Sequence, residues 1–527
     1  MSARPSSHPA RRGPAGAPLA TVDLAIVGGG SVAVSFLHQF LHALARPAPG
    51  LSIALFEPQP VVGPGTAYQH DLCSNLLNIP AGRMSALARE RDDFVQWLHG
   101  QDGPWLRRMG VQEISASAFL PRPVFGCYLQ DVHRRALARA QAMGVAVRVI
   151  GQAAVAVRPA PQGATVATAG GEPVHARRVV LCNGNLPSVA FAELAHLPGY
   201  FNSPYPVQAL TAAVGRDDPV CILGTSLSAV DAIVALHASG HRGSIHCVSR
   251  NGRLPSVRSP HNPSVCLPQW PPAQAQGEPT LDGLLQSLRQ ALRQAGGIEE
   301  PDDVLGKAGP AREALDDEIA RSQAGPRLWQ AVAAATNDRI EIIWRALPRH
   351  EKERFHRDWR SLWMARRATF PMQNALVLQK LLHQGRLQVR GGLRAVRHEP
   401  ASGRFVLRTA SGDAAAAPWL VNATSFSTDV RATRDALVRQ LLDERYAAAD
   451  ELGGFALDFD TGCLLAPDGD RQAAVSVLGS LAAGTYFWTT SMDVNARLAL
   501  GQAERLAAEL APHAAARQTP SALQAPA

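Results

Sequence analysis

Residues 22–33 read VDLAIVGGGSVA, in which a mostly apolar run is followed by three consecutive glycines. The following residues, SVAVSFLHQFLHALAR (31–46), repeat apolar side chains at the spacing of a helix. A second apolar run, LSIALFEP (51–58), comes next. This succession of strand, glycine turn, helix and strand is a βαβ unit, which predicts a parallel sheet with helices on its faces.

The glycine turn has the spacing of a phosphate-binding turn. Gly28, Gly30 and Ala33 fit the pattern G-x-G-x-x-G/A, and Ser31 opens the helix whose N-terminus would face the phosphates. Glu57 ends the second strand, where an acidic residue hydrogen-bonds a ribose hydroxyl. We therefore predict a dinucleotide site, and the alternative is a glycine-rich turn in an unrelated α/β protein.

A second unit of the same kind occupies the middle of the chain, in PVCILGTSLSAVDAIVALHASG (219–240) and SIHCVSRNG (244–252). Gly224, Ser226 and Ala229 take the positions of the fingerprint, with serine in place of the central glycine. Ser249 and Arg250 stand where the first unit has its acid, and an arginine there suits the 2′-phosphate of NADP. This unit predicts NADPH binding, unless Arg250 is only a solvated surface residue.

Composition excludes several classes of function. The 527 residues carry a formal charge of +8, without a block of like charges or a basic run interleaved with aromatics, so we expect no nucleic-acid partner. The seven cysteines are widely spaced and form no CxxC, which indicates neither a metal site nor a redox dithiol. The sequence contains no apolar run long enough for a membrane span and no secretory leader, so we expect a cytoplasmic protein.

Several further stretches resemble one family, the bacterial FAD/NAD(P)-binding flavoproteins related to flavin-dependent N-hydroxylating monooxygenases. They are GPGTAYQ (63–69), NLLNIPAGRMSA (75–86), FLPRPVFGCYLQD (119–131), LCNGNLP (181–187), NSPYP (202–206), VNATS (421–425) and the segment 478–510. The resemblance implies an α/β fold with two Rossmann-like dinucleotide-binding domains, one for FAD and one for NADPH, and a helical insertion. It also implies that the NADPH domain interrupts the FAD domain.

The predicted boundaries follow from this resemblance. We expect disordered tails at 1–20 and 512–527, an FAD-binding domain at 21–205 and 415–511, and an NADPH-binding domain at 206–414 with a helical insertion at about 266–375. Four tryptophans of that insertion, at positions 329, 344, 359 and 363, have the spacing of helix-packing anchors.

The resemblance also implies which residues surround the cofactor. It places Thr66, Tyr68, Asn75, Asn78, Met84, Arg122, Gly184 and Gly484 in the cofactor-binding set. Buried amides need partners, which an isoalloxazine ring could supply to Asn75 and Asn78, although either residue could instead cap the turn before Pro80. The sequence departs from the family at Ser226 and at Ser425, where relatives usually carry glycine, and it lacks the F-x-G-x-x-x-H fingerprint of the flavin monooxygenases proper.

The resemblance implies a monooxygenase that uses FAD, NADPH and O2 to N-hydroxylate a small amine or amino acid through a C4a-hydroperoxyflavin. Such chemistry needs few protein acids or bases, and we assign no catalytic residue. A flavin-dependent NAD(P)H reductase or electron-transfer oxidoreductase is the alternative, and a cofactor-binding sensor is a third reading. Arg366, Arg367 and Arg122 are candidates for a substrate carboxylate, because a guanidinium group binds carboxylates through two parallel hydrogen bonds. The sequence predicts no oligomeric state.

Overall fold

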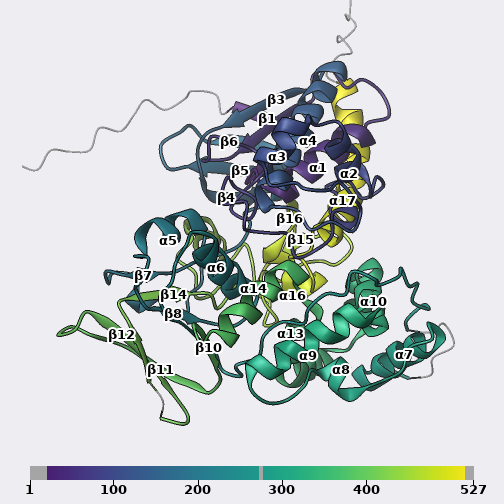
Figure 1. Ribbon diagram of the computed structural model, residues 1–527. Coiled ribbons are helices and arrows are strands. Elements are labelled where there is room, and N and C mark those ends of the chain that lie inside the picture. The colour runs from purple at the N-terminus through teal and green to yellow at the C-terminus, as the bar shows by residue number, and fades with distance from the viewer. Residues whose placement is uncertain (1–19, 272–276, 413, 517–527) are drawn as a thin grey trace, which may run out of the picture.

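The larger sheet, which is mixed with a parallel centre, is built around the first apolar run. The computed structural model describes residues 20–271, 277–412 and 414–516. The sheet has eight strands in the order β15-β16-β6-β1-β2-β3, with the hairpin β4–β5 attached through β5 to β6 (Figure 1). Its strands are β1 (Ala20–Val27), β2 (Ser52–Phe56), β3 (Ala146–Ile150), β4 (Ala154–Ala160), β5 (Gly163–Thr168), β6 (Val174–Leu181), β15 (Cys463–Leu465) and β16 (Arg471–Val477). The run of pairs from β3 to β16 is parallel.

Both faces of this sheet are buried. Leu24 and Ile26 of β1 lie in one apolar core, and the alternating residues Ala25 and Val27 lie in the other. The first core is covered by α1 (Ser31–Ala43), which packs against α4 (Arg122–Ala142) and α17 (Met492–Ala516). The second is covered by α15 (Ala436–Asp443) and the β4–β5 hairpin. Near α4 lie α2 (Asp93–His99), α3 (Gly103–Arg108) and the short helix η1 (Ala81–Arg83).

The second sheet has five strands, all parallel, in the order β10-β9-β8-β14-β7. They are β7 (Tyr200–Phe201), β8 (Val220–Leu223), β9 (Ile245–Val248), β10 (Leu387–Arg390) and β14 (Trp419–Asn422). The helices α5 (Val207–Ala213), α6 (Leu227–Ala238) and α14 (Met372–His383) belong to the core on one face. The antiparallel strands β11 (Leu393–Glu399), β12 (Arg404–Thr409) and β13 (Ala414–Ala417) cover the other.

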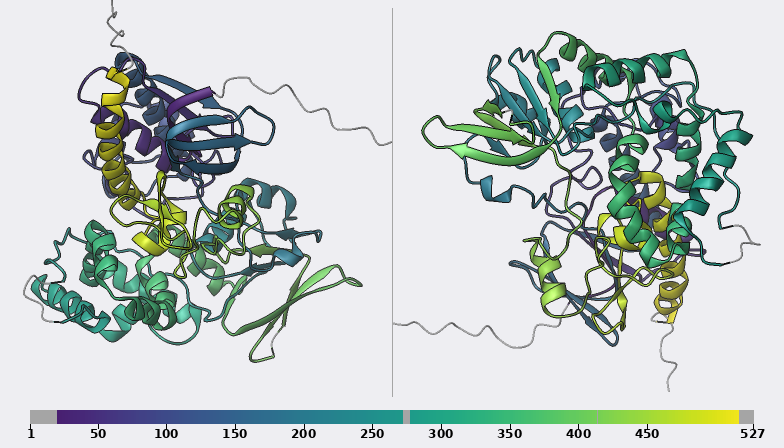
Figure 2. Two further views of the ribbon diagram at one scale, coloured as in Figure 1. Left: turned by 180° about the vertical axis from the view of Figure 1, so that it is seen from behind. Right: turned by 90° about the horizontal axis from the view of Figure 1, so that it is seen from below.

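A group of helices lies between β9 and α14 and forms a separate lobe beside the second sheet (Figure 2). The group consists of α7 (Leu281–Gln294), α8 (Pro301–Leu305), α9 (Ala311–Ala324), α10 (Leu328–Ala335), η3 (Thr336–Arg339), α11 (Ile340–Ala346), α12 (Arg349–Arg354), η4 (Phe355–Trp359) and α13 (Arg360–Arg367). Trp329 and Trp344 are buried in its cores, and Trp359 packs at the edge of one of them. Tryptophans therefore anchor these helices, as their spacing predicts.

The chain passes through the first sheet, enters the second sheet and the helical lobe, and returns to the first sheet. After β14 it reaches α15, β15 and β16, then η5 (Ser480–Ala482), α16 (Ala483–Tyr486) and α17. The predicted α/β class with two parallel, Rossmann-like sheets is confirmed; the domain boundaries given above remain predictions.

The predicted tails fall mostly outside the described residues. Ala20 already belongs to β1, and residues 512–516 continue α17, so this helix ends later than the sequence predicts. None of the helices within the described ranges combines the length and the apolar character that a membrane crossing requires.

Candidate functional site

The turn between β1 and α1 is held open by a glycine that no other residue can replace. Gly28 has a φ of 93°, and its N–H donates to the carbonyl of Phe56 at 2.8 Å. A Cβ at this position would lie 2.4 Å from the carbonyl oxygen of Cys182, at the end of β6. The close approach of β1 to β6 therefore requires glycine at position 28.

Glu57 is fixed to the same turn. Its Oε2 accepts the N–H of Gly29 at 2.7 Å, and its Oε1 accepts the N–H of Gln59 at 2.8 Å. The side chain is buried beside the glycines, because a Cβ on Gly29 would collide with it. The acid thus lies at the carboxyl end of β2, next to the turn; its contact with a ribose remains a prediction.

Gly30 differs from Gly28, because the space around it is open. A Cβ on Gly30 would meet only the Cα of Gly65, at 3.7 Å. Ser31 begins α1, and Ala33 is completely buried, so it allows the helix to pack closely on the sheet. The first N–H groups of a helix lack partners within the helix and attract phosphate. A bare glycine in front of these donors is the arrangement that a pyrophosphate needs.

The turn between β8 and α6 repeats this construction. Gly224 has a φ of 105°, and its N–H donates to the carbonyl of Val248 at 2.9 Å. A Cβ on Gly224 would lie 2.6 Å from the carbonyl oxygen of Ala423, which follows β14. Phe56 and Cys182 of the first sheet thus correspond to Val248 and Ala423 of the second.

The remaining predicted residues of the second turn also gather there. Ser226 is the exposed N-cap residue of α6, and Ala229 is buried. Ser249 takes the place of Glu57, and its Oγ lies 3.1 Å from Oγ1 of Thr225, the counterpart of Gly29. In the second turn, a contact between two hydroxyl groups thus takes the place of the hydrogen bond between the Gly29 N–H and the Glu57 carboxylate.

Arg250 follows Ser249 and is exposed. Burial lowers the pKa of Arg360, and the nearby charge of Arg250 lowers it further. Within the described part of the chain, neither arginine forms an ion pair with a carboxylate. The neighbouring residues are in contact, because Nδ2 of Asn251 donates to Oγ of Ser361 at 3.1 Å, so the segments that carry Arg250 and Arg360 adjoin at the edge of the second turn. The sequence analysis identified Arg250 but missed Arg360, which comes from α13.

The residues after β6 and β14 form a matched pair of turns. Gly184 has a φ of 79°, and nothing lies within 4 Å of where its Cβ would be. Ser425 stands at the corresponding position and has a φ of 94°, a conformation that favours glycine. The departure at Ser425 therefore changes the side chain but keeps the backbone of the turn.

The loop predicted to approach the flavin contains a buried polar atom without a partner. Asn75 is 2 % exposed, and its Oδ1 makes no hydrogen bond to any residue that the structure describes. Its backbone carbonyl accepts the N–H of Arg122 at 2.7 Å. Because a buried polar atom without a partner is costly, Asn75 fits a ligand in this region better than it fits a simple cap.

The other residues predicted for this region differ in exposure. Thr66 is exposed, Asn78 and Tyr68 are partly buried, and Met84 is buried in the apolar core. The Tyr68 ring packs edge-on against Phe125 at 4.8 Å between centroids. Contacts of these four side chains with a cofactor remain predictions.

Two further unpartnered atoms lie just before and within α17, where the sequence analysis named no residue. They are Oγ1 of Thr489 and Oδ1 of Asn495, both buried. Nδ2 of Asn495 donates to the carbonyl of Thr489 at 2.7 Å, so the two residues are adjacent. Such orphaned atoms depend on tertiary packing, and no sequence pattern reveals them.

Arg122 serves the contact between the two sheets in this structure. Its Nη2 donates to Oδ2 of Asp231 in α6 at 2.9 Å, and the hydroxyl of Tyr205 donates to the same oxygen at 2.5 Å. Asp71 adds a second contact by accepting the N–H groups of Val207 and Gln208 at the start of α5. The structure thus pairs Arg122 with a protein carboxylate, and its predicted contacts with a cofactor or substrate remain untested.

Gly484 is explained by packing alone. Its N–H donates to the carbonyl of Gly453 at 2.7 Å, and its carbonyl accepts Nε1 of Trp344 at 2.8 Å. A Cβ would lie 2.4 Å from Cγ of Asp450. Its backbone is therefore already engaged within the protein, which gives no support to a cofactor contact.

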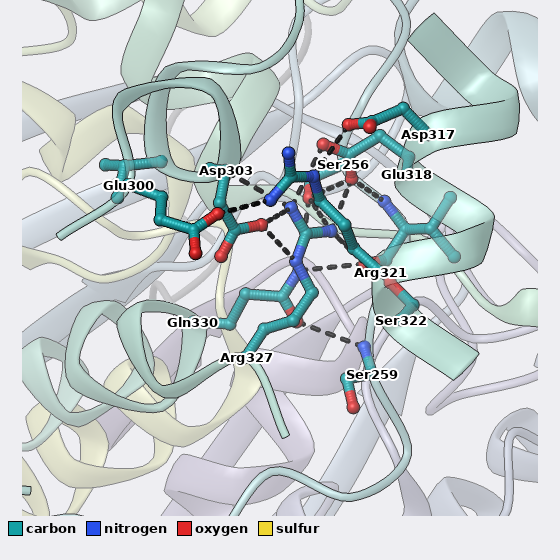
Figure 3. Close-up of polar contacts among 12 residues, drawn as sticks. Ser256, Ser259, Glu300, Asp303, Asp317, Glu318, Arg321, Ser322, Arg327 and Gln330 are labelled. Carbon is teal, nitrogen blue, oxygen red and sulfur yellow. Dashed lines mark hydrogen bonds and ion pairs between the residues drawn. The ribbon is translucent and has the colours of Figure 1, made fainter. Parts of the chain in front are cut away.

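Arg366 belongs to a buried ionic network rather than to an open site. In this network, shown in Figure 3, Glu318 of α9 accepts Nη1 of Arg327 at 2.6 Å. Nη2 of Arg366 forms an ion pair with the other oxygen of Glu318 at 2.7 Å and donates to the carbonyl of Asp303 at 2.7 Å. Arg366 is thus committed to structure, which does not favour the substrate role that we predicted for it.

Arg367, one residue further along α13, has a different environment. Its Nε donates to the carbonyl of Ala333 at 3.0 Å, and its Nη2 donates to Oδ1 of Asn337 at 2.7 Å. Its guanidinium group lies 5.6 Å from the centre of the Trp488 ring. Arg367 thus faces the segment that leads into α17 and lacks an ion-pair partner within the described residues.

The residues at the first turn fit FAD. The bare face of Gly30 leaves room for a pyrophosphate, and Glu57 lies within the turn. In the loop before η1, Oδ1 of Asn75 has no hydrogen-bond partner among the described residues. The structure therefore brings Gly28, Gly30, Ser31 and Glu57 together at one sheet edge. It gathers Gly224, Ser226, Ser249 and Arg250 at the other, and it leaves Arg366 and Gly484 outside both groups.

A family model matches the part of the chain that contains the first glycine turn. Residues 25–186 match the family model described as FAD-NAD(P)-binding. No curated protein sequence matches the chain.

Solved structures match along almost the whole chain. L-lysine 6-monooxygenase from Pseudomonas syringae is 16 % identical, with a TM-score of 0.57 over 93 % of this chain and 99 % of that one. The ornithine N-hydroxylase from Kutzneria sp. 744, in complex with reduced FAD, NADP+ and L-ornithine, is 16 % identical, with a TM-score of 0.51 over 95 % and 100 %. The FAD-bound cadaverine monooxygenase from Erwinia amylovora is 14 % identical, with a TM-score of 0.55 over 94 % and 95 %.

At these identities the likeness establishes the fold. The predicted resemblance is thereby confirmed for the architecture of the chain and for its first nucleotide-binding segment. The chain shares its overall fold with these lysine, ornithine and cadaverine oxygenases, and residues 25–186 match the FAD-NAD(P)-binding family model.

Proposed function

We propose that the protein is an FAD- and NADPH-dependent monooxygenase that N-hydroxylates a small amine or amino acid. The observation that carries the proposal is the presence, in one chain, of two turns with the same backbone hydrogen-bond scheme. The N–H groups of Gly28 and Gly224 each donate to the last carbonyl of the neighbouring strand. Each glycine also packs against the carbonyl of the residue that follows the strand on the other side. The overall fold of amine and amino-acid oxygenases supports the same reading.

The first turn would hold FAD. Gly30 and the first N–H groups of α1 would bind the pyrophosphate, Glu57 the ribose, and Asn75 the ring system. Bound FAD would supply the two-electron redox chemistry that side chains lack.

The second turn would hold NADPH. Ser226 at the N-cap of α6 would face the pyrophosphate, and Arg250 with Arg360 would bind the 2′-phosphate. NADH carries a hydroxyl at this position, so only NADPH would use both arginines.

The helical lobe would shield the reacting centre from water, which stabilises reactive intermediates of oxygen chemistry. It is fastened to the start of α17 by hydrogen bonds from Nδ2 of Asn337 to Asp493 and by an ion pair between Arg497 and Glu341 at 2.7 Å. Trp344 also stacks on Phe487 with 4.5 Å between centroids. These contacts hold aromatic side chains beside the segment that joins η5 to α17.

Nucleotide preference gives a test of the second turn. We expect Arg250→Ala to raise the KM for NADPH about ten- to a hundredfold, because a charge-assisted contact contributes about 1.5–3 kcal/mol, and to leave the KM for NADH nearly unchanged. Flavin reduction by each nucleotide is the measurement. Arg242→Ala, an exposed arginine in the loop between α6 and β9, is the control. Equal losses with both nucleotides would mean that Arg250 supports the fold rather than the phosphate.

The reaction itself is tested by product analysis. The FAD-loaded protein is given NADPH, O2 and a panel of amines and amino acids, and NADPH consumption is compared with the yield of N-hydroxylated product. We expect that, with one substrate of the panel, the amount of NADPH consumed matches the yield of N-hydroxylated product. A reductase would instead form hydrogen peroxide with every amine and would reduce a quinone or a protein acceptor faster than O2.

A further inference from the structure

The helical lobe contains a cavity of about 230 Å³ between α7 and the helices α10, η3 and α11. Its walls include Leu284 and Leu288 of α7, Trp270 in the segment after β9, and Ile343 of α11. None of the described residues that line it belongs to either nucleotide turn. The cavity is therefore separate from the sites proposed for FAD and NADPH.

The cavity stays open because α7 is fixed at both of its ends. Leu281, at the start of the helix, belongs to one apolar cluster of the lobe, and Leu292, near its end, belongs to another. Leu284 and Leu288 lie between these ends and are only partly buried. A helix held in this way cannot collapse onto the space beneath its middle, and an unfilled apolar cavity lowers stability. The lobe thus maintains a space that a ligand would fill with a gain in stability.

The mouth of the cavity carries positive charge. Cys266, Asp338 and Arg339 line the cavity and are exposed, so it reaches the surface there. Asp338 forms an ion pair with Arg91 at 3.2 Å, which offsets its negative charge. The side chain of Arg339 has no hydrogen-bond or ion-pair partner among the residues that the structure describes. An anionic group at the mouth would supply that partner.

The interior offers little to bind water. Ser287 contributes a hydroxyl group to the wall, but this hydroxyl already donates to the carbonyl of Gly283 at 3.0 Å. A buried water needs about two to four polar partners, and cavities lined by apolar side chains remain dry. The interior therefore favours an apolar group.

The size of the cavity limits that apolar group. An apolar cavity of about 150 Å³ accommodates a benzene molecule. The larger cavity of the lobe has room for an aromatic ring with a short chain, and the end of the chain would lie at the mouth. A carboxylate there would meet Arg339, because a guanidinium group binds a carboxylate through two parallel hydrogen bonds.

We propose that this cavity binds an apolar monocarboxylate whose body has the size of a phenylalkyl group. The inference goes beyond the proposed function and does not depend on it. Ile343, in the wall, precedes Trp344, whose Nε1 donates to the carbonyl of Gly484 at 2.8 Å and whose ring stacks on Phe487 with 4.5 Å between centroids. The monocarboxylate would thus be an accessory ligand that stabilises the contact of the lobe with α16.

Cys266 provides a direct probe of occupancy. It is exposed, whereas Cys73 and Cys127 are half-buried and the other four cysteines are buried, so a small thiol reagent should modify Cys266 first. The FAD-loaded protein is titrated with phenylpropanoate, and the modification of Cys266 is followed by mass spectrometry. At a concentration of about ten times the Kd, phenylpropanoate should slow the modification about tenfold and raise the melting temperature. Unchanged reactivity of Cys266 up to the solubility limit of phenylpropanoate would overturn the proposal.

A cavity-filling substitution assigns the binding to this cavity. Ser287→Phe places a ring in the space beneath α7 and should abolish phenylpropanoate binding, measured by calorimetry. Gln286→Phe places the same side chain at the exposed neighbouring position, so this matched control should bind as the wild type does. Leu284→Trp serves the same purpose if Ser287→Phe folds poorly. Binding that persists in a folded cavity-filled variant would overturn the proposal.

Substitution of Arg339 tests the charge at the mouth. The wild type should bind phenylpropanoate about fivefold more tightly than the neutral phenylpropanamide, as expected for an exposed pair of opposite charges. Arg339→Gln should remove this preference without weakening the binding of the amide, and Arg339→Lys should retain part of it. Arg293→Gln, an exposed arginine in the last turn of α7 that does not line the cavity, is the control. Equal affinities of the wild type for the carboxylate and the amide would overturn the assignment of a carboxylate.

The flavin absorption spectrum reports whether the ligand binds elsewhere. Phenylpropanoate should leave the spectrum unchanged, because the cavity lies outside the nucleotide turns. A spectral change that persists in Ser287→Phe would place the ligand at the flavin and overturn the proposal. Product assays judge the proposed function separately. Failure to form any N-hydroxylated product would refute the monooxygenase and leave this site intact, whereas hydroxylation without phenylpropanoate binding would refute this site alone.

Discussion

Gly28 and Gly30 lie two residues apart in the first turn, yet they have different tasks. Gly28 is required by the protein itself, because a Cβ there would overlap the carbonyl of Cys182. Gly30 has room for a Cβ in the ligand-free protein and is required only if a phosphate occupies that room. Substitutions at the two positions therefore separate folding from cofactor binding.

We expect Gly30→Val to abolish FAD retention while the protein still folds. The branched side chain would occupy the path of the pyrophosphate. The backbone at position 30 is extended, with φ of −77° and ψ of −168°, so valine fits there without a left-handed conformation. Flavin absorbance of the purified protein and its circular dichroism are the measurements. Gly28→Ala is the contrasting variant and should reduce the yield of folded protein. Normal flavin content in Gly30→Val would refute the assignment of the turn.

Ser425 gives a second prediction at the same scale. Its φ of 94° favours glycine, and a non-glycine residue in such a conformation costs about 1–3 kcal/mol. Ser425→Gly should therefore raise the free energy of unfolding by about 1 kcal/mol, after part of the gain is offset by the greater freedom of glycine in the unfolded chain. Thermal melting of the two proteins tests this. Ser402→Gly, in an exposed turn, is the control. A lower melting temperature for Ser425→Gly would show that the serine hydroxyl has a role of its own.

At the scale of elements, the ionic network of Figure 3 joins α9, the start of α10 and the segment after β9. Glu318 accepts hydrogen bonds from Ser256 and from the N–H of Val257, in addition to those from Arg327. Although burial acts in the opposite direction, hydrogen bonds from Arg327 and the charges of Arg366 and Arg327 lower the pKa of Glu318. The network therefore depends on an ionised glutamate.

This dependence predicts how stability responds to acid. Because the pKa of Glu318 is lower in the folded protein than in the unfolded chain, its contribution is complete above the unfolded value of about 4.3 and is lost as the pH falls further. Glu318→Gln should destabilise the protein by about 3–5 kcal/mol at neutral pH, because it leaves two buried arginines under-neutralised. The difference from the wild type should shrink below about pH 4.

Melting temperatures between pH 3 and 8 test this expectation. Glu299→Gln is the control, because Glu299 forms an exposed ion pair with Arg289 and such pairs contribute about 0–1 kcal/mol. A constant difference between wild type and Glu318→Gln across the whole range would show that Glu318 contributes through packing rather than charge.

The elements also show what the sequence can and cannot predict. The strands β1 and β8, the glycine turns and the helices α1 and α6 are local patterns, and the sequence predicts them closely. Thr489 and Asn495 lack any local signal, because each is distinguished by a buried oxygen without a partner among the described residues, which only the folded chain reveals. The substrate role predicted for Arg366 is not favoured for the same reason. The sequence shows two adjacent arginines, but it does not show that Glu318 forms an ion pair with Arg366 and not with Arg367.

At the scale of the whole molecule, one buried ion pair joins the two sheets. Arg122 begins α4 of the first sheet region, and Asp231 lies in α6 of the second. The side chain of Asp231 is 5 % exposed and that of Arg122 is 18 % exposed. The relative position of the two nucleotide turns therefore depends on a pair of charges that solvent hardly reaches.

We expect Asp231→Asn to destabilise the protein by about 3 kcal/mol, since it leaves the Arg122 charge without its counter-ion. It should also slow flavin reduction by NADPH, because the two turns would lose part of their alignment. Urea unfolding and stopped-flow reduction are the measurements. Asp217→Asn removes an exposed carboxylate of the same region and should change neither. Full stability in Asp231→Asn would show that the contact with Tyr205 is sufficient.

The return of the chain to its first sheet has a consequence for biosynthesis. The carboxyl end of β6 pairs with β16, so this edge stays open until the ribosome has made residues 182–477 as well. At about 5–20 residues per second, that interval lasts on the order of tens of seconds. During it the second sheet, whose strands are all contained within Tyr200–Asn422, can form first, while the edge of β6 remains exposed to unwanted strand pairing. The helix α1 that follows the first nucleotide turn packs against α17, so its surroundings are complete only when the last helix has left the ribosome.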